Sequence, residues 1–330
     1  MVTIYDVAKK LNLSIATVSR ALNGHDDVKP TTKQKVIDMA KKMGYFPNSM
    51  ARTLTTKKSW NIGILFSDDM NSGFKHIFFA NVINKIIETA AERGYDVSIL
   101  SGNIGKKKTS YLDNARYRLL DGIIIATVDT TKEDVQKLIK SDLPVALIDQ
   151  KFEEAICVNS KNRKGIKSLV NHLYEKGYKK ITYITGQLNN YVAKDRKQAF
   201  LDITKELNIQ DECNTIEGIF TDSILSYEIT KNIMTKSDRP DAIMYSDDTA
   251  ATGGLKYLVE NGFSIPNDVA ICGYDGVELS QLVTPRLTTV QQDINKLGNY
   301  VTNLLIDKIE GKNPEKEHWV DVELLIGETT

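Results

Sequence analysis

From Trp60 onward, short apolar runs alternate with amphipathic stretches that are long enough to form helices. The runs are almost continuously apolar, which is typical of strands buried on both faces of a parallel sheet. They fall into two successive series, residues 62–66, 96–100, 122–126 and 144–149, and then residues 180–184, 242–245 and 269–273. This alternation predicts an α/β body of two doubly wound parallel-sheet lobes. A helix near 292–310 and a strand near 318–326 are expected to cross back between the lobes.

The first 46 residues have a different pattern, which predicts three short helices. Capping signals stand at the expected helix starts, namely Thr3 with Asp6, then Ser14, and then Thr31 with Gln34. Residues that favour helix ends, Asn23-Gly24 and Gly44, close the second and third segments. The head is therefore expected to be a small all-α domain.

The head is basic, although the whole chain has a formal net charge of zero. Residues 1–60 contain 11 of the 43 Lys and Arg residues and 4 of the 43 Asp and Glu residues, so this segment carries a net charge of +7. The remainder of the chain carries −7. Such asymmetry indicates a nucleic-acid-binding module joined to another body, although a basic surface in contact only with water would give the same count.

The second helix of the head has the composition of a DNA-reading helix. Two helices joined by a short turn and supported by a third form the helix-turn-helix plan, whose second helix enters the major groove. Val18 and Leu22 are expected to face inward, which leaves for the DNA Ile15, Ala16, Thr17, Ser19 and Arg20. Arginine can bond guanine at two atoms, and hydroxyls can bond phosphates or bases. The alternative is a plain three-helix bundle with a surface arginine.

Four segments of the head have the residues and spacing of a known family. They are residues 4–8 (IYDVA), 14–23 (SIATVSRALN), 28–32 (VKPTT) and 44–48 (GYFPN). Over its first sixty residues the chain closely resembles the lactose-repressor (LacI/GalR) family of transcriptional regulators. The DNA-contacting set that the resemblance implies is Thr3, Tyr5, Ser14, Ile15, Ala16, Thr17, Ser19, Arg20, Asn23, Asn48, Ala51 and Leu54.

The same resemblance implies a hinge helix after Pro47. In the family, this stretch orders on operator DNA, and its apolar residue, here Leu54, wedges into the minor groove. So short a helix is marginal in water, and an inserted leucine costs unstacking but kinks the duplex and admits more contact. A simple linker whose Leu54 packs on the core is the alternative.

The body also resembles this family, whose core is similar to periplasmic sugar-binding proteins. Residues 196–200 (RKQAF) match the family's Arg-x-x-Gly-aromatic segment with alanine in place of glycine. Residues 273–275 (GYD) and 285–292 (PRLTTVQQ) match well. Residues 247–251 (DDTAA) match an Asn-Asp-x-x-Ala segment, but the first residue replaces a ligand-facing amide by a carboxylate. Glu328 stands where the family has a basic residue.

Polar residues follow several of the predicted strands. Ligands of open parallel sheets bind beyond the carboxyl ends of the strands, so a cleft between the lobes is expected there. Carboxylates accept hydrogen bonds from sugar hydroxyls, an arginine donates two at once, and an aromatic ring can stack on a sugar. The predicted ligand-binding residues are Asp149, Arg196, Phe220, Asp247, Asp275, His76 and Phe78. Two alternatives stay open: an aspartate at a strand end often caps the next helix, and Phe220 could belong to the core.

The resemblance also bears on the identity of the ligand. The segment 67–77 and the Arg196 motif are similar to the β-galactosidase-operon repressors of the family, which implies a galactoside or another oligosaccharide. A purine or a phosphorylated sugar is the alternative. The head is also similar to the catabolite-control branch, which binds a phosphoprotein corepressor, but Thr284 stands where that branch has its partner-binding arginine.

Motifs that would indicate an enzyme or a cofactor site are missing from the sequence. No strand leads into GxGxxG, and GxxxxGK[ST], GxSxG and HExxH are absent, so neither catalysis nor a cofactor is expected. The three cysteines and four histidines have no metal-ligand spacing, so no metal is expected. With no signal peptide and no apolar span, the protein is expected to be cytoplasmic. A sugar receptor that binds no DNA would explain the body but not the basic head.

These features together predict a repressor of a carbohydrate-utilisation operon, controlled by a sugar and acting as a homodimer on a pseudo-palindromic operator. We expect a helix-turn-helix domain over residues 1–46, a hinge or linker over 47–59, and a ligand-binding and dimerisation core over 60–330. Within the core, the first lobe is expected to span 60–158 and 291–318, and the second lobe 159–290 and 319–330. Whether the ligand induces or corepresses is not decided by the sequence.

Overall fold

The computed structural model describes residues 2–46, 58–66 and 76–330. The chain divides into two compact units, Met1–Ser59 and Trp60–Thr330, each with its own hydrophobic core. The expected hinge residues Asn48, Ala51 and Leu54 lie outside the described residues, as does most of the segment 67–77. The expectations for these residues therefore stay predictions.

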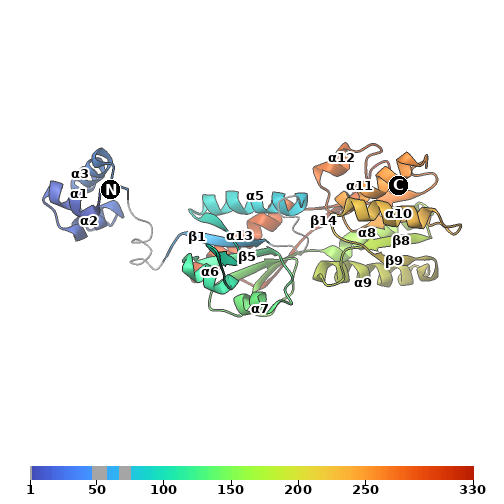
Figure 1. Cartoon of the computed structure of the whole chain (residues 1–330), viewed down its shortest axis with the longest axis horizontal. Coiled ribbons are helices and arrows are strands. Elements are labelled where there is room, and N and C mark those ends of the chain that lie inside the picture. Colours follow the sequence, from blue (N-terminus) through green and yellow to red (C-terminus); the bar gives the residue numbers. More distant parts are fainter. Residues whose placement is uncertain (1, 47–57, 67–75) are drawn as a thin grey trace. The chain divides into compact units, whose positions relative to one another are not determined.

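Over residues 2–46 the N-terminal unit has three helices, α1 (Ile4–Leu11), α2 (Ile15–Leu22) and α3 (Pro30–Met43) (Figure 1). The carboxylate of Asp6 accepts hydrogen bonds from the backbone N–H and the hydroxyl of Thr3, each at 2.8 Å. The hydroxyl of Ser14 accepts from the backbone N–H of Thr17 at 3.0 Å. The predicted caps of the first two helices are thereby confirmed. The helices enclose a small core of Val7, Ala8, Val18, Ala21, Val28 and Val36.

The start of α3 differs from the expectation. The helix begins at Pro30 with Lys29 as its N-cap residue, so the expected capping box of Thr31 and Gln34 is wrong. Proline suits the first helical position because its φ is already helical and the missing N–H needs no partner there. Gln34 instead donates to the carboxylate of Asp38 at 2.9 Å.

The first lobe of the body is built on a six-stranded sheet in the order β13-β7-β6-β5-β1-β2. All neighbouring strands in it are parallel. The strands are β1 (Asn61–Phe66), β2 (Asp96–Leu100), β5 (Gly122–Thr127), β6 (Val145–Ile148), β7 (Ile156–Ser160) and β13 (Glu317–Val320). This sheet reaches Ser160 and Val320, two residues beyond the lobe boundaries expected at 158 and 318.

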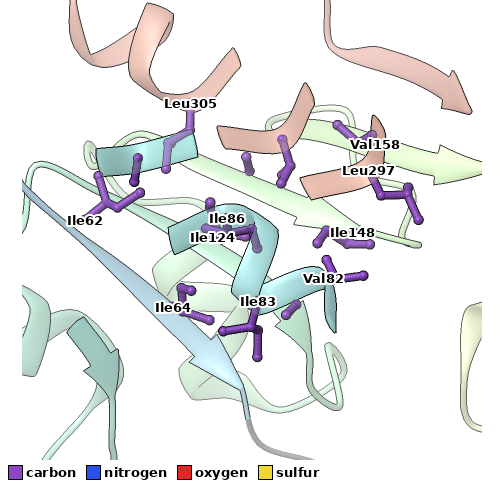
Figure 2. Close-up of a cluster of buried hydrophobic side chains, with 14 of the residues drawn as sticks. Ile62, Ile64, Val82, Ile83, Ile86, Ile124, Ile148, Val158, Leu297 and Leu305 are labelled. Atoms are coloured by element: carbon purple, nitrogen blue, oxygen red, sulfur yellow. The ribbon is translucent and has the colours of Figure 1, made fainter. Parts of the chain in front are cut away.

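Helices cover both faces of this sheet. α5 (Ile77–Glu92) and α13 (Ile294–Ile309) pack on one face, and α6 (Tyr111–Tyr117) and α7 (Glu133–Ile139) pack on the other. Figure 2 shows the first of these interfaces, where Val82, Ile86 and Leu305 of the helices meet Ile62 and Ile124 of the strands. A short hairpin of β3 (Asn103–Ile104) and β4 (Lys107–Lys108) precedes α6.

The second lobe repeats the plan with a four-stranded parallel sheet in the order β11-β10-β8-β9. Its strands are β8 (Ile181–Thr185), β9 (Asn214–Glu217), β10 (Ala242–Tyr245) and β11 (Ala270–Cys272). α8 (Asn162–Glu175) and α9 (Tyr191–Glu206) cover one face, and α10 (Ser223–Met234) and α11 (Asp248–Glu260) cover the other. A 3-10 turn (Gln210–Glu212) precedes β9, and the short α12 (Glu278–Leu282) follows β11.

The chain crosses between the lobes near its C-terminal end. β12 (Thr289–Gln292) pairs antiparallel with β14 (Val322–Leu325), and α13 and β13 lie between them in sequence. The single strand expected near 318–326 is wrong, because Asp321 divides it into β13 and β14. The Asp321 carboxylate bonds the N–H of Val322 at 3.0 Å and the amine of Lys164 at 2.6 Å.

The expected fold class, a helical head with two doubly wound parallel-sheet lobes, is confirmed. Within the part of the chain that the structure describes, no helix has both the length and the apolar character needed to cross a membrane.

Candidate functional site

The outer face of the head carries the residues expected to meet DNA. The structure describes nine of these twelve residues, and every one of the nine is at least partly exposed. Tyr5 is 67% exposed and Ile15 is 40% exposed, although both are apolar or aromatic. Val18 is fully buried and Leu22 is partly buried beneath them, as expected. The face is therefore free to contact a partner, with α2 at its centre.

Two side chains of this face have interaction partners within the head. The guanidinium of Arg20 lies 2.5 Å from the carboxylate of Asp27, which belongs to the loop after α2. Both side chains are about half exposed, so the pair adds little to the stability of the head. The Ser14 hydroxyl is bonded to the hydroxyl of Thr17 at 2.8 Å in addition to its capping role. Arg20 is thus presented on this face as one member of a weak ion pair with Asp27.

A cleft of about 1000 Å³, including its open mouth, is lined by residues of both lobes. The first lobe supplies the start of α5 and the segments that follow β5 and β6. The second lobe supplies the β8–α9 connection, the residues after β9 and β11, and Gln292 at the end of β12. These are the carboxyl ends of parallel strands, where ligands of such sheets bind. Six of the seven expected ligand residues line the cleft: His76, Phe78, Asp149, Arg196, Phe220 and Asp275.

Arg196, in the second turn of α9, is only 2% exposed. Its Nε donates to Oδ1 of Asn162 at 2.8 Å, and its Nη1 donates to the carbonyl of Ser246 at 3.1 Å. The guanidinium carbon lies 3.5 Å from the centre of the Tyr274 ring, and Nη2 lies 3.8 Å from Asp275 Oδ1. Burial alone would lower the pKa of Arg196, but Tyr274 and the nearby carboxylates offset this, and the net shift is upward. The side chain is a fixed positive charge at the wall of the cleft.

Asp149 and Asp275 are held in unusual backbone conformations, with φ of 53° and 104°. Asp149 Oδ1 accepts from the N–H of Ser160 at 3.1 Å, and Asp275 Oδ1 accepts from Nε2 of Gln292 at 2.8 Å. Burial raises the pKa of both carboxyls, and Arg196 opposes that shift. Among the described residues, no donor reaches the second oxygen of either carboxyl. Strained backbone at both positions is consistent with a functional constraint.

Aromatic rings form another part of the cleft wall. His76 and Phe79 meet edge to face with ring centres 4.8 Å apart, and Phe78 lies 5.2 Å from Phe79 in the same arrangement. Phe220 comes from the second lobe, and its ring occupies the space that a side chain at Gly186 would need. The cleft therefore combines apolar rings with carboxylate, amide and guanidinium groups.

Comparison with known proteins agrees with this architecture. Residues 3–48 match the family model "Bacterial regulatory proteins, lacI family", and residues 170–330 match "Periplasmic binding protein-like domain". The chain is 31% identical to the ribose operon repressor of Halalkalibacterium halodurans, over 100% of this chain and 97% of that protein. It is 32% identical to catabolite control protein A of Priestia megaterium, over 92% of this chain and 91% of that protein.

The chain belongs to the LacI family of bacterial regulatory proteins. Its fold is also that of a lac repressor dimer solved with operator and the anti-inducer ONPF, with a TM-score of 0.85 at 24% identity over 99% of this chain and 98% of that one. As a LacI-family member it is a DNA-binding transcriptional repressor with an effector-binding domain, and this family is non-enzymatic. The resemblance stated from the sequence is confirmed.

Asp247 is the one expected ligand residue that does not line the cleft. It is 1% exposed and is the N-cap of α11, where Oδ1 accepts from the N–H of Ala250 at 2.9 Å. Its Oδ2 accepts from the hydroxyl of Ser246 at 2.8 Å and from the N–H of Thr221 at 2.9 Å. The hydrogen bonds of Asp247 are therefore those of a helix cap, which was the alternative to a ligand contact at this position.

Several cleft residues were not expected from the sequence. Gln292, Asn190 and Asp129 line the cleft, and Asn190 also caps α9 through the N–H of Val192 at 2.8 Å. Oε1 of Gln292 is buried and has no partner among the described residues. Gln292 could have been proposed from the sequence, because it is the last residue of the segment 285–292 that resembles the LacI family.

Proposed function

We propose that this chain represses a carbohydrate-utilisation operon and that a small neutral sugar in the cleft sets its affinity for operator DNA. The observation that carries the proposal is the buried Arg196, placed against Asp275 in a cleft that Asp149 and Phe220 also line. One relative bears the name ribose operon repressor, which supports a carbohydrate operon.

The chemistry of the cleft suits a polyhydroxylated ligand. Asp149 and Asp275 each retain one carboxylate oxygen that can accept from a hydroxyl, and the guanidinium of Arg196 can donate to a ring or hydroxyl oxygen. Phe220 offers a ring on which the apolar face of a pyranose or furanose can stack. Gln292 adds an amide oxygen in need of a donor.

The charge of the cleft favours a neutral ligand over a phosphorylated one. Among the described lining residues, Asp129, Asp149 and Asp275 face a single arginine, Arg196. Hydrogen bonds from Thr131 lower the pKa of Asp129, which keeps that carboxylate ionised. A phosphate in the cleft would meet the ionised carboxylate of Asp129, and like charge in such a site is costly. The guanidinium that could compensate it already donates to Asn162 and Ser246. We therefore rank a galactoside, a pentose or another neutral sugar above a phosphosugar.

We propose that the DNA-reading residues are those of the exposed face of α2, with Thr3 and Tyr5 beside it, and that two chains pair to place two such helices on a pseudo-palindromic operator. Residues 47–59 then serve as the hinge between head and core, with Asn48, Ala51 and Leu54 on the DNA. A ligand that changes how the lobes meet alters operator affinity. A coupling of about 1–3 kcal/mol is sufficient, and it must act equally in both directions.

The proposal can be tested by fluorescence anisotropy on an operator selected by the protein from a random duplex library. The titration is repeated with D-ribose, cellobiose, lactose, glucose 6-phosphate and hypoxanthine. We expect salt-sensitive binding that a neutral sugar changes by about tenfold or more. Arg196→Lys keeps the charge but loses the planar fork of donors, so it should blunt the sugar response and leave operator affinity intact. A response only to hypoxanthine or to the phosphosugar would refute the sugar proposal, and absence of DNA binding would refute the regulatory one.

A further inference from the structure

Asp247 connects three elements of the second lobe. It follows β10, caps α11 through the N–H of Ala250, and reaches the segment after β9 through the N–H of Thr221. The hydroxyl of Ser246 donates to the same oxygen as Thr221 does. All three partners are donors, so the position requires two acceptor oxygens. An asparagine would supply only one oxygen and would turn its NH₂ group toward another donor.

The bond to Thr221 holds a backbone conformation that threonine rarely adopts. Thr221 has a φ of 60°, which is unfavourable for a β-branched residue and persists only where surrounding contacts enforce it. Its neighbour Phe220 is fixed from two further sides. The backbone N–H of Phe220 donates to Oε1 of Gln187 at 3.2 Å, and its ring fills the space beside Gly186.

We infer that Asp247 is a positioning residue that aims the Phe220 ring into the cleft through the N–H of Thr221, rather than a residue that contacts the ligand. Asp247 itself is buried outside the cleft wall, whereas Phe220 and Thr221 both line it. The carboxylate thus sets the affinity of the second lobe for ligands that offer an apolar face. The predicted effect of Asp247 on ligand binding rests on the proposed function, whereas its predicted effect on the position of the Phe220 ring does not.

The structural part is tested without a ligand by ¹⁹F NMR of the full chain labelled with 4-fluorophenylalanine. The Phe220 signal is assigned by its loss in Phe220→Leu. We expect Asp247→Asn to move or broaden that signal. Asp222→Ala is the matched control, because Asp222 caps α10 through the N–H of Leu225 at 2.8 Å yet gives no hydrogen bond to Thr221. An unchanged signal in Asp247→Asn, or the same change in Asp222→Ala, would overturn the inference.

The binding part is tested by calorimetric titration with whichever of D-ribose, cellobiose or lactose changes operator affinity. Asp247→Asn should weaken sugar binding about tenfold, and the loss should fall to about twofold or less in a Phe220→Ala background. A tenfold loss in both backgrounds would mean that Asp247 acts on the ligand directly. If Asp247→Asn does not fold, Asp247→Ser takes its place, because its hydroxyl can still cap α11 but is too short to hold Thr221 as well. If no sugar binds the unmodified protein, the proposed function fails while the NMR result still decides the positioning role.

Discussion

Replacement of Arg196 by methionine should strongly destabilise the body, and the structure indicates by how much. Methionine retains most of the volume but removes the donors to Asn162 and Ser246 and the positive charge beside Asp275. Removing one partner of a buried ion pair costs about 3–5 kcal/mol, because the other charge is left uncompensated. The 3.8 Å separation is too long for a direct hydrogen bond, so we expect the lower end, about 3 kcal/mol. That is a large fraction of the usual stability of a domain.

The loss should also depend on pH in a defined direction. Burial already raises the pKa of Asp275 and Arg196 opposes that shift, so removal of Arg196 raises the pKa further. The folded variant then binds a proton that the unfolded chain has released, and its stability increases as the pH falls toward the unfolded pKa. The difference in unfolding free energy between variant and parent should therefore be smaller at about pH 5 than at about pH 8.

Urea unfolding followed by tryptophan fluorescence measures this difference directly, because both tryptophans, Trp60 and Trp319, lie in the body. Arg163→Met is the control, since the Arg163 side chain is 52% exposed and its ion pairs lie at the surface. The control should cost less than about 1 kcal/mol. An Arg196→Met loss no larger than that of the control, or a loss that is equal at both pH values, would refute the assignment of Arg196 as the compensating charge of the cleft.

Three further changes test the head and the second lobe. In anisotropy titrations Arg20→Ala should weaken operator binding by about 1–3 kcal/mol and relax one base position per half-site, whereas equal loss on every duplex would exclude base reading. Asp27→Ala releases Arg20 and should lower the ratio of specific to nonspecific affinity, while Asp26→Ala removes the same charge and should leave that ratio unchanged. Gly253→Ala would push a methyl group into the backbone at the start of α10 and should cost about 1–3 kcal/mol or more in urea unfolding. Gly102→Ala has room for its methyl group and should stay within about 0.5 kcal/mol; equal costs would refute the steric argument.

The strands that could be predicted are those that form a recognisable apolar run in the sequence, whether the strand is fully buried, as β10 is, or only partly buried, as β2 is. β2 and β10 coincide with the apolar runs expected at 96–100 and 242–245. β7, with the sequence ICVNS, was missed because its last two residues are polar. Those two residues form hydrogen bonds with the segment that follows β6. Asn159 Oδ1 accepts from the N–H of Gln150 at 2.8 Å, and the N–H of Ser160 donates to Asp149. β7 also pairs with β13, which lies far along the chain, and the residue pattern of a single segment does not reveal such a partner.

The cleft could be predicted only in part for a related reason. Asp149 and Asp275 follow strands and face the cleft, and Asp247 follows a strand in the same way but turns its carboxylate to α11. In an α/β fold, the carboxyl end of one strand and the amino end of the next helix coincide, so a ligand contact and a helix cap occupy equivalent positions in the sequence. Only the hydrogen-bond donors around the side chain distinguish a ligand contact from a helix cap, and these donors come from other segments of the chain.

Glu328, which stands where the family resemblance has a basic residue, has a local explanation. Its carboxylate accepts from the backbone N–H of Arg286 at 2.9 Å, and its own N–H donates to the carbonyl of Arg286 at 2.6 Å. The guanidinium of Arg286 lies beside the same segment, at 3.4 Å from the carbonyl of Ile326. Both hydrogen bonds of Glu328 are thus made to the backbone of Arg286, which gives an acidic residue at this position a structural role.

Effector control requires that the cleft touch a segment that joins the two lobes, and Gln292 provides such a contact. Its side-chain amide donates to Asp275 Oδ1 at 2.8 Å, and its backbone N–H donates to the carbonyl of Asp275 at 3.1 Å. Two residues later the chain enters α13, which packs with α5 in the core of the first lobe. A ligand that competes for the Asp275 carboxylate therefore acts on a connection between the lobes, not on the second lobe alone. Because α13 has buried residues from Leu297 to Ile306, we expect a change at this junction to displace the helix as a rigid body rather than to be absorbed in a loop.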